Sequence, residues 1–374
     1  MASNNSFNRA QNLGVLQGQQ VIRDSANQGD RVDFFSFRVT TRSSLQGVLR
    51  GLKSDVNLAL FNRDRQRIGF SQNTAQQSQP INTILERGRY FLKTTLRDGE
   101  TRYRLRLSTS PLAAPDPATA KFVGLTTDNN LAFFNNDNLS NVRRVSVTGL
   151  QTGENLLGID FRPLNGQLFG LGSTSRLYRI DPATGAATAV NAQPFAIPLS
   201  GTNFGFDFNP SVDRIRVVSD AGQNLRLVPD TGAVVDSNLA LDGIQPDGNL
   251  NGATNSIVAT AYTNSFAGVA PITPPAATTQ YTINATTDEL FIQNPPNAGT
   301  QTRVGALGVD FSGNAGFDVV SQPASATAPA TNTAYALSNA SLYGINLATG
   351  AANLFGDVRD NQTALSFKGL AARP

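Results

Sequence analysis

The chain has 374 residues, of which 15% are charged, with 33 glycines and 19 prolines but no cysteine, histidine or tryptophan. Its length exceeds that of a usual single domain, so we expect two domains. The composition is typical of many short strands and turns, which predicts an all-β fold. Missing cysteine and histidine exclude disulfides, thiolate nucleophiles, Cys-type zinc sites and the usual acid–base catalyst at neutral pH. We therefore expect a protein that is not an enzyme and uses no cofactor.

Charge is unevenly divided along the chain. Residues 1–110 hold 17 Lys and Arg against 8 Asp and Glu, whereas residues 111–374 hold 13 against 19. This dipole indicates an acidic partner for the basic part. The start, MASNNSFNRAQNLG, lacks a secretory signal, and no stretch approaches the roughly 20 apolar residues of a membrane span. We expect no membrane span and either a cytoplasmic location or export by a signal-free route.

Alternating apolar residues predict an antiparallel β-sandwich over residues 1–108. The pair Asp98-Gly99 is typical of a type I′ hairpin turn. Pairing across this turn would place Leu92 opposite Leu105 in the core. The opposite face would then carry cations from both strands.

We predict that this cationic face binds a partner. Its residues are Phe91, Lys93, Arg102, Arg104 and Arg106, with Lys93 opposite Arg104 and Phe91 opposite Arg106. Like charges packed side by side cost stability, which favours an anionic partner. An acidic protein is preferred and a glycan is the alternative, while nucleic acid is not expected because Phe91 is the only interleaved aromatic residue. The structural alternative is a solvated face whose charges suppress edge pairing.

Three motifs in this part of the chain resemble the bacterial pre-peptidase C-terminal (PPC) domain. They are GDRVDFFSF (29–37), LRGLKSDVNLALFNRDRQRIG (49–69) and LERGRYFLKTTLRDGETRYRLRLS (85–108). The resemblance covers nearly all of residues 5–108 and implies a jelly-roll-like, non-catalytic accessory module that binds calcium, matrix or carbohydrate in some relatives. Asp55 and Asn57 stand where relatives carry acidic loop residues, but the basic residues around them make this a weak calcium site.

A Pro/Ala-rich linker, residues 109–120, precedes a repetitive second domain, residues 121–374. A period of about 50 residues is typical of propeller blades. A Gly-hydrophobic-Asp-hydrophobic strand recurs at 158–161, 205–208 and 316–319. We predict a five-bladed β-propeller in which the C-terminal strand, residues 367–371, completes a blade begun at 121–147 and so removes free edges.

The second domain also resembles the domain-of-unknown-function family 4394 over about residues 121–372. The motifs LLGIDFRPLNGQLFGL, GATNSIVATAYTNS, DELFIQNPPNAGT, GFDVVS and LYGINLATG carry the resemblance. It implies a propeller-like fold and supplies no function. Both resemblances are common in cyanobacteria and other bacteria with many exported or surface proteins.

Asp160, Asp207 and Asp318 occupy the same place in the repeated strand, so we expect all three near a central channel. Some five-bladed propellers are glycosidases, which need two carboxylates at a set separation. The structural alternative is that each Asp accepts a backbone hydrogen bond from the next blade. The chain offers no tryptophan for stacking on sugar rings, which favours the structural alternative.

The long segment 237–255 also predicts a weak cation site at Asp242 and Asp247, for which turn formation is the alternative. Taken together, the sequence predicts a non-enzymatic adaptor that mediates protein–protein interaction, as a subunit of a larger assembly with an acidic partner. One alternative is an exported surface protein that binds glycan or matrix. Another is a propeller glycoside hydrolase.

Overall fold

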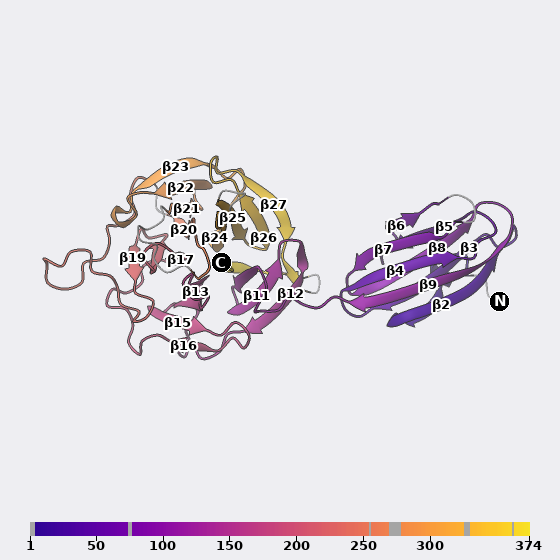
Figure 1. Ribbon diagram of the computed structural model, residues 1–374, viewed down its shortest axis with the longest axis horizontal. Coiled ribbons are helices and arrows are strands. Elements are labelled where there is room, and N and C mark those ends of the chain that lie inside the picture. The colour runs from indigo at the N-terminus through magenta and orange to yellow at the C-terminus, as the bar shows by residue number, and fades with distance from the viewer. Residues whose placement is uncertain (1–3, 74–76, 254–255, 269–277, 325–329, 361–362) are drawn as a thin grey trace. The chain divides into compact units, whose positions relative to one another are not determined.

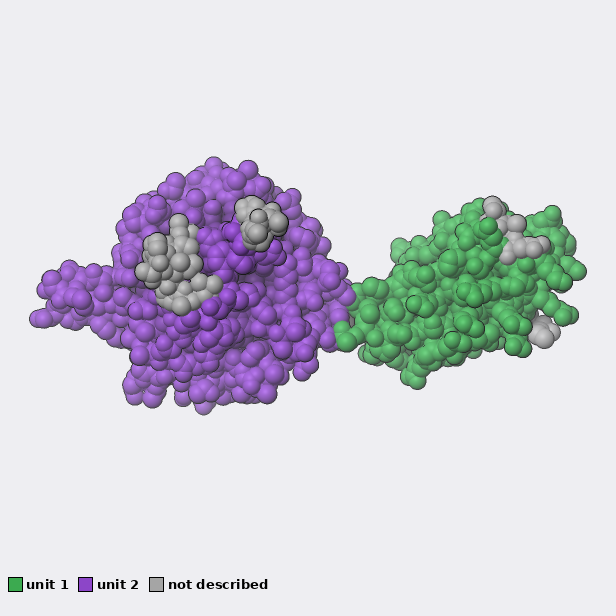
Figure 2. All heavy atoms as spheres, viewed as in Figure 1, with its two compact units in different colours: residues 1–113 green, residues 114–374 purple. Residues whose placement is uncertain are grey.

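The computed structural model describes residues 4–73, 77–253, 256–268, 278–324, 330–360 and 363–374. The chain folds into two compact units, residues 1–113 and 114–374 (Figure 2). The prediction of an all-β fold is confirmed. Apart from β-strands, the described residues form two short 3-10 helices, η1 (Phe7–Arg9) and η2 (Pro296–Ala298). Within these ranges no helix has the length and apolarity needed to cross a membrane.

The first unit is a sandwich of two β-sheets (Figure 1). One sheet has the order β1 (Gln11–Val15), β3 (Val32–Val39), β8 (Gly88–Leu96), β5 (Val56–Phe61) and β6 (Arg67–Ser71). The other has the order β2 (Gly18–Ala26), β9 (Thr101–Pro111), β4 (Ser43–Arg50) and β7 (Gln79–Leu85). Strand β9 thus extends three residues into the predicted linker.

The predicted hairpin across Asp98-Gly99 is wrong, because β8 and β9 belong to different sheets. Leu92 pairs with Phe35 of β3 on one side and with Leu60 of β5 on the other. Both edges of β8 are therefore occupied, and β9 is likewise filled by β2 and β4. The turn has positive φ only at Gly99, whereas a type I′ turn needs it at both central residues. The apolar faces of both strands still line one buried core.

The second unit contains five sheets of three or four strands (Figure 1). The first sheet joins β10 (Phe122–Thr126), β11 (Asn130–Asn135) and β12 (Asn138–Ser146) to the C-terminal strand β30 (Phe367–Ala372). The second holds β13 (Leu156–Phe161), β14 (Leu168–Gly172), β15 (Arg176–Ile180) and β16 (Ala187–Ala189), and the third holds β17 (Phe204–Asn209), β18 (Arg214–Ser219) and β19 (Asn224–Leu227). The fourth holds β20 (Ile257–Tyr262), β21 (Gln280–Asn284), β22 (Glu289–Gln293) and β23 (Gln301–Ala306), and the fifth holds β24 (Ala315–Gln322), β25 (Thr331–Ser338), β26 (Ser341–Ile345) and β27 (Ala352–Asp357). A two-stranded pair, β28 (Arg359–Asp360) and β29 (Thr363–Ala364), follows.

One strand from each sheet lies in an inner set around a common centre (Figure 1). Strand β13 contacts β17, β17 contacts β20, β20 contacts β24, β24 contacts β30, and β30 contacts β13. As predicted, the C-terminal strand pairs with the strand that opens the unit, since Val123 of β10 lies opposite Ala371 of β30.

Glycines let these inner strands approach closely. A Cβ atom on Gly205 would lie 2.6 Å from the backbone nitrogen of Thr260, and one on Gly316 would lie 2.4 Å from that of Leu370. Both contacts are to backbone and cannot be relieved by a rotamer change. The repeated glycine of the sequence motif therefore sets the spacing of the inner strands.

Hydrophobic clusters fill four of the five spaces between neighbouring sheets. The first and second sheets share one cluster, the second and third another, the fourth and fifth a third, and the fifth and first a fourth. Between the third and fourth sheets lie buried polar side chains instead, including Arg216, Asn224, Gln280 and Gln293. The interface between the third and fourth sheets is therefore polar, unlike the other four.

Candidate functional sites

Five arginines gather on the outer face of the sheet β2-β9-β4-β7. Arg104 of β9 lies directly opposite Arg23 of β2 and directly opposite Arg50 of β4, so three guanidinium groups form one row across three strands. Arg102 and Arg106 extend the set along β9. Neighbouring strands lie about 4.8 Å apart, and alternate residues of one strand about 6.8 Å. We call these five side chains the arginine face.

The arginine face lines an open groove of about 990 Å³. Among the described residues that line this groove, Asp24 is the one acidic side chain. No ion pair joins the five arginines to an acidic group within the part of the chain that the structure describes. Edge protection does not explain Arg102, Arg104 and Arg106, because β9 is an interior strand with neighbours on both sides.

Two residues of the predicted cationic face lie elsewhere. Lys93 and Phe91 are on β8, in the other sheet of the sandwich, because β8 pairs with β3 and β5. Lys93 Nζ lies 5.6 Å from the ring centre of Phe34, and Phe91 is buried and contacts Phe7 edge-on. Sequence reasoning missed Arg23 and Arg50, whose positions next to Arg104 depend on pairing between distant strands.

Asp160, Asp207 and Asp318 do come together, with carboxylate oxygens within 4.8 Å of one another and all three side chains buried. Each accepts a backbone hydrogen bond from the next inner strand. Asp160 Oδ2 accepts from Phe208 N at 2.8 Å and Asp207 Oδ1 from Tyr262 N at 3.0 Å, while Asp318 Oδ2 accepts from Ala372 N. This is the arrangement that the structural alternative predicts.

The surroundings of these carboxyl groups favour their protonated forms. Burial and the mutual charge of the three groups raise the pKa of Asp160 and of Asp207 well above the ordinary value, and burial raises the pKa of Asp318 to about 6. A proton or a cation would relieve the repulsion. A cavity lies among residues of the same inner strands, including Gly158, Gly205 and Gly316, and measures about 10 Å³. It has room for about one water molecule and is far too small for a sugar. The geometry gives no support to glycoside hydrolysis.

The other two predicted cation sites have unsuitable surroundings. The Asn57 amide oxygen can accept from Arg97 Nε at 3.0 Å, which places a guanidinium beside the supposed calcium ligands Asp55 and Asn57. Asp247 is fully engaged, since Oδ2 lies 2.6 Å from Arg216 Nη1 and Oδ1 lies 2.7 Å from Arg226 Nη2. Asp242 is exposed and apart from this cluster. The structure thus pairs Asp247, one of the two predicted cation ligands, with two arginines.

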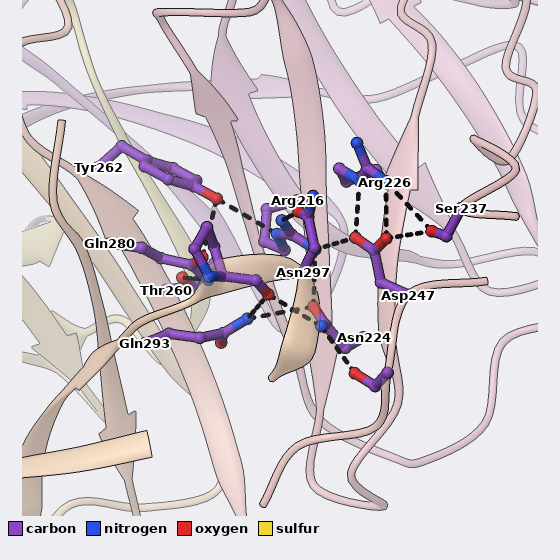
Figure 3. Close-up of polar contacts among 12 residues, drawn as sticks. Arg216, Asn224, Arg226, Ser237, Asp247, Thr260, Tyr262, Gln280, Gln293 and Asn297 are labelled. Atoms are coloured by element: carbon purple, nitrogen blue, oxygen red, sulfur yellow. Dashed lines mark hydrogen bonds and ion pairs between the residues drawn. The ribbon is translucent and has the colours of Figure 1, made fainter. Parts of the chain in front are cut away.

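Arg216 is the centre of the polar interface between the third and fourth sheets (Figure 3). Its Nε donates to the Tyr262 hydroxyl at 3.2 Å, Nη1 to Asn224 Oδ1 at 2.8 Å, and Nη2 to Asn297 Oδ1 at 2.8 Å. Tyr262 in turn donates to Gln280 Oε1 at 2.8 Å. The network thus links β18 to β20, β21 and the helix η2.

Sequence reasoning missed this network, although its signal is visible. Arg214 and Arg216 alternate with the apolar Ile215 and Val217 on β18, which is the pattern of a strand with one polar face. On β21 the segment QYTIN likewise puts Gln280, Thr282 and Asn284 on one face. Two facing strands with polar inner faces indicate a buried hydrogen-bond network.

Comparisons with known proteins found one matching family and several similar solved structures. The family described as Domain of unknown function (DUF4394) matches residues 130–371. No curated protein matches the sequence. Among solved structures, the chain is similar to the pre-peptidase C-terminal domain of collagenase from Bacillus anthracis, with 18% identity, a TM-score of 0.23, and coverage of 27% of this chain and 94% of that chain. It is also similar to PliG, a periplasmic lysozyme inhibitor from Aeromonas hydrophila, with 14% identity, a TM-score of 0.20, and coverage of 27% and 97%. PorZ, a surface component of the type-IX secretion system of Porphyromonas gingivalis, shows 11% identity, a TM-score of 0.31, and coverage of 65% and 29%.

Proposed function

The chain belongs to the family described as Domain of unknown function (DUF4394). For this chain we propose a non-enzymatic adaptor whose first unit binds an acidic protein through the arginine face. The observation that carries the proposal is the row of Arg23, Arg104 and Arg50 across three paired strands. Like charges directly opposite one another lower the stability of a sheet. A partner that supplies carboxylates would remove this cost.

The geometry of the face favours an extended anionic surface. Guanidinium groups bind carboxylates through two parallel N–H donors, so planar acidic side chains suit them well. The rows across and along the strands repeat at about 4.8 Å and 6.8 Å. A partner strand or loop with several Asp or Glu residues would match these repeats. Val21, which is 46% exposed beside Arg23, adds apolar contact area for a protein.

For the second unit we infer a closed five-bladed propeller. The five sheets and the sequence of contacts between their inner strands support this inference, as does the pairing of β10 with β30. A ring that ends on its own first sheet leaves few free strand edges. Such a unit is a rigid platform, which suits an adaptor better than an enzyme.

For the first unit we infer a PPC-like, jelly-roll-like sandwich. The three motifs at 29–37, 49–69 and 85–108 support it, together with the two-sheet arrangement of the strands. In this proposal the unit acts as the docking module, and the arginine face is its contact surface.

The test compares three purified full-length baits in affinity capture from the native organism at low and at high salt. The first bait is the wild type, and the second carries Arg102→Gln, Arg104→Gln and Arg106→Gln. The third is a matched control with Arg38→Gln, Arg63→Gln and Arg67→Gln, which removes equal charge from exposed positions away from the arginine face. We expect an acidic protein to be retained by the wild type and the control at low salt and to be lost by the second bait.

Salt dependence separates this proposal from its alternatives. Contacts made through exposed charges weaken as salt rises, so the second bait should also show a flatter salt response. Equal retention by all three baits would refute the proposal. Binding to acidic glycans such as heparin or alginate, without a protein partner, would favour an exported glycan-binding protein instead.

A further inference from the structure

A cavity of about 190 Å³ opens beside the polar interface of the second unit. The residues that line it include Arg214, Arg216, Arg226, Tyr262, Val212 and Pro296. This volume has room for several water molecules or for one small organic molecule. This is smaller than a pocket for a drug-sized ligand and suits a small molecule.

The charges around the cavity are unbalanced toward the positive. Asp247 is shared by Arg216 and Arg226, so one carboxylate faces two guanidinium groups. Arg214 forms no ion pair among the described residues, and the hydrogen bonds of its side chain run from Nη1 to the backbone oxygens of Val212 and Asp213. The neighbouring Asp213 is already bound by Arg162, whose Nε lies 2.8 Å from Asp213 Oδ1.

Donors are also left over within the described part of the structure. Arg226 donates through Nε and Nη2, to Asp247 and Ser237, while its Nη1 has no protein acceptor there. The Nε and Nη2 of Arg214 have none either. Guanidinium groups bind carboxylates through charge-assisted and often paired N–H donors, so donors left over beside a cavity suit a carboxylate ligand. Hydrogen bonds to Asp247, and for Arg216 also to Asn224 and Asn297, hold the two guanidinium groups in place without a ligand.

The packing exception between the third and fourth sheets gives the cavity its significance. The other four spaces between sheets are filled by hydrophobic clusters, which are the simpler way to join two sheets. A buried polar network in place of a hydrophobic cluster is a departure of the kind that functional sites produce. The exposed side chain of Val212 and the ring of Pro296 offer the apolar wall that an organic anion needs.

We propose that this cavity binds a small organic carboxylate, with the carboxylate against Arg214 and Arg226 and the apolar part against Val212 and Pro296. The site lies wholly in the second unit and does not depend on the arginine face of the first. The proposal concerns binding alone and includes no reaction of the ligand.

Calorimetric titration of the full chain tests the proposal, with benzoate, hexanoate and succinate as the probes. Benzamide serves as the uncharged match for benzoate. We expect at least one carboxylate to bind with a dissociation constant of about 1 mM or below. If benzoate binds, we expect benzamide to bind at least tenfold more weakly than benzoate.

Two variants localise the binding. Arg214→Gln removes a charge that no described ion pair uses, and Val212→Glu places a negative charge at a position that is 46% exposed. Each should weaken carboxylate binding at least tenfold while leaving the unfolding temperature of the free protein unchanged. Arg143→Gln, on exposed β12, is the matched control and should leave the affinity unchanged.

Three outcomes would overturn the proposal. The first is that none of the three carboxylates binds. The second is that Arg143→Gln weakens binding as much as Arg214→Gln does. The third is that inorganic phosphate binds as tightly as the best carboxylate, which would make the site a general anion site without selectivity for an organic ligand.

Discussion

Arg216 Nη1 lies 2.6 Å from Asp247 Oδ2, and the two side chains are 2% and 0% exposed. A buried ion pair of this kind contributes little net stability compared with a hydrophobic pair, because both charges lose their hydration. Removing one partner alone is costly, since the other charge then stays buried without compensation. The pair therefore holds the polar interface in one arrangement instead of adding much to its strength.

The first prediction concerns loss of the buried charge. Arg216→Met should lower the free energy of unfolding of the second unit by about 1–3 kcal/mol, because buried polar partners of Arg216 lose their donor while Asp247 keeps only Arg226 as its charge partner. Arg226→Met should cost less, since Arg226 is 21% exposed. Urea unfolding followed by tyrosine fluorescence measures both, as five of the seven tyrosines lie in residues 114–374. A loss of under about 1 kcal/mol in Arg216→Met would show that the interface does not depend on this charge.

The second prediction concerns the cost of the arginine row. Arg104→Gln removes the central charge between Arg23 and Arg50, and it should raise the stability of the first unit by up to about 1 kcal/mol at low salt. Salt screens exposed charges, so the gain should shrink as salt is added. Thermal unfolding in a salt series measures the effect, with Arg38→Gln as the control. A destabilised Arg104→Gln variant would mean that the guanidinium makes a favourable contact within the unit.

The third prediction concerns pH. Burial raises the pKa of Asp318 to about 6 and the pKa of Asp160 and Asp207 well above the ordinary value. A carboxyl with a raised pKa in the folded state stabilises that state fully below the unfolded pKa near 4, and this contribution is lost as pH rises through the folded pKa. For a group shifted as far as Asp318, the second unit should therefore lose roughly 3 kcal/mol of stability between about pH 4 and pH 6. Ionisation of Asp160 and Asp207, whose pKa values are also raised, should lower the stability further as pH rises.

Substitution at Asp207 checks this pH dependence. In Asp207→Asn the amide oxygen can keep the hydrogen bond from Tyr262 N while the charge is removed. We expect the variant to match the wild type near pH 5 and to exceed its unfolding temperature at pH 8. The exposed Asp137→Asn is the control and should follow the wild type at both pH values. Equal pH profiles for the wild type and Asp207→Asn would show that the cluster stays ionised or holds a cation.

Local patterns predicted the strands and the clustering of Asp160, Asp207 and Asp318, because repeated positions in repeated strands converge on the same place. The same reasoning failed for Lys93 and Phe91. A turn residue such as Gly99 indicates where the chain reverses, but the choice between a hairpin and a crossing to the second sheet depends on which other strands are available as partners. Those partners, β3 and β5 for β8, lie far away in the sequence.

Long-range pairing also explains why the binding residues were found only in part. Arg23 and Arg50 join Arg104 through pairing between strands that are far apart in the sequence. Asp247 was predicted as a cation ligand because acidic residues in a Gly- and Asn-rich segment are typical of metal loops. Its actual partner, Arg216, is on a strand some thirty residues earlier, and only the folded chain brings the two together.

The last prediction concerns the spacing of the inner strands. In Gly316→Ala the new Cβ would lie 2.4 Å from Leu370 N, a backbone atom of the C-terminal strand, so β24 and β30 would have to move apart. We expect the second unit to lose about 1–3 kcal/mol of stability, the usual cost of overpacking. Gly344→Ala in the same sheet is the matched control, because its Cβ would meet the ring of Phe355, which is 50% exposed and free to move. Urea unfolding of both variants, read by tyrosine fluorescence, decides the point. If Gly316→Ala is no less stable than Gly344→Ala, then the close contact between β24 and β30 does not limit the packing of these two inner strands.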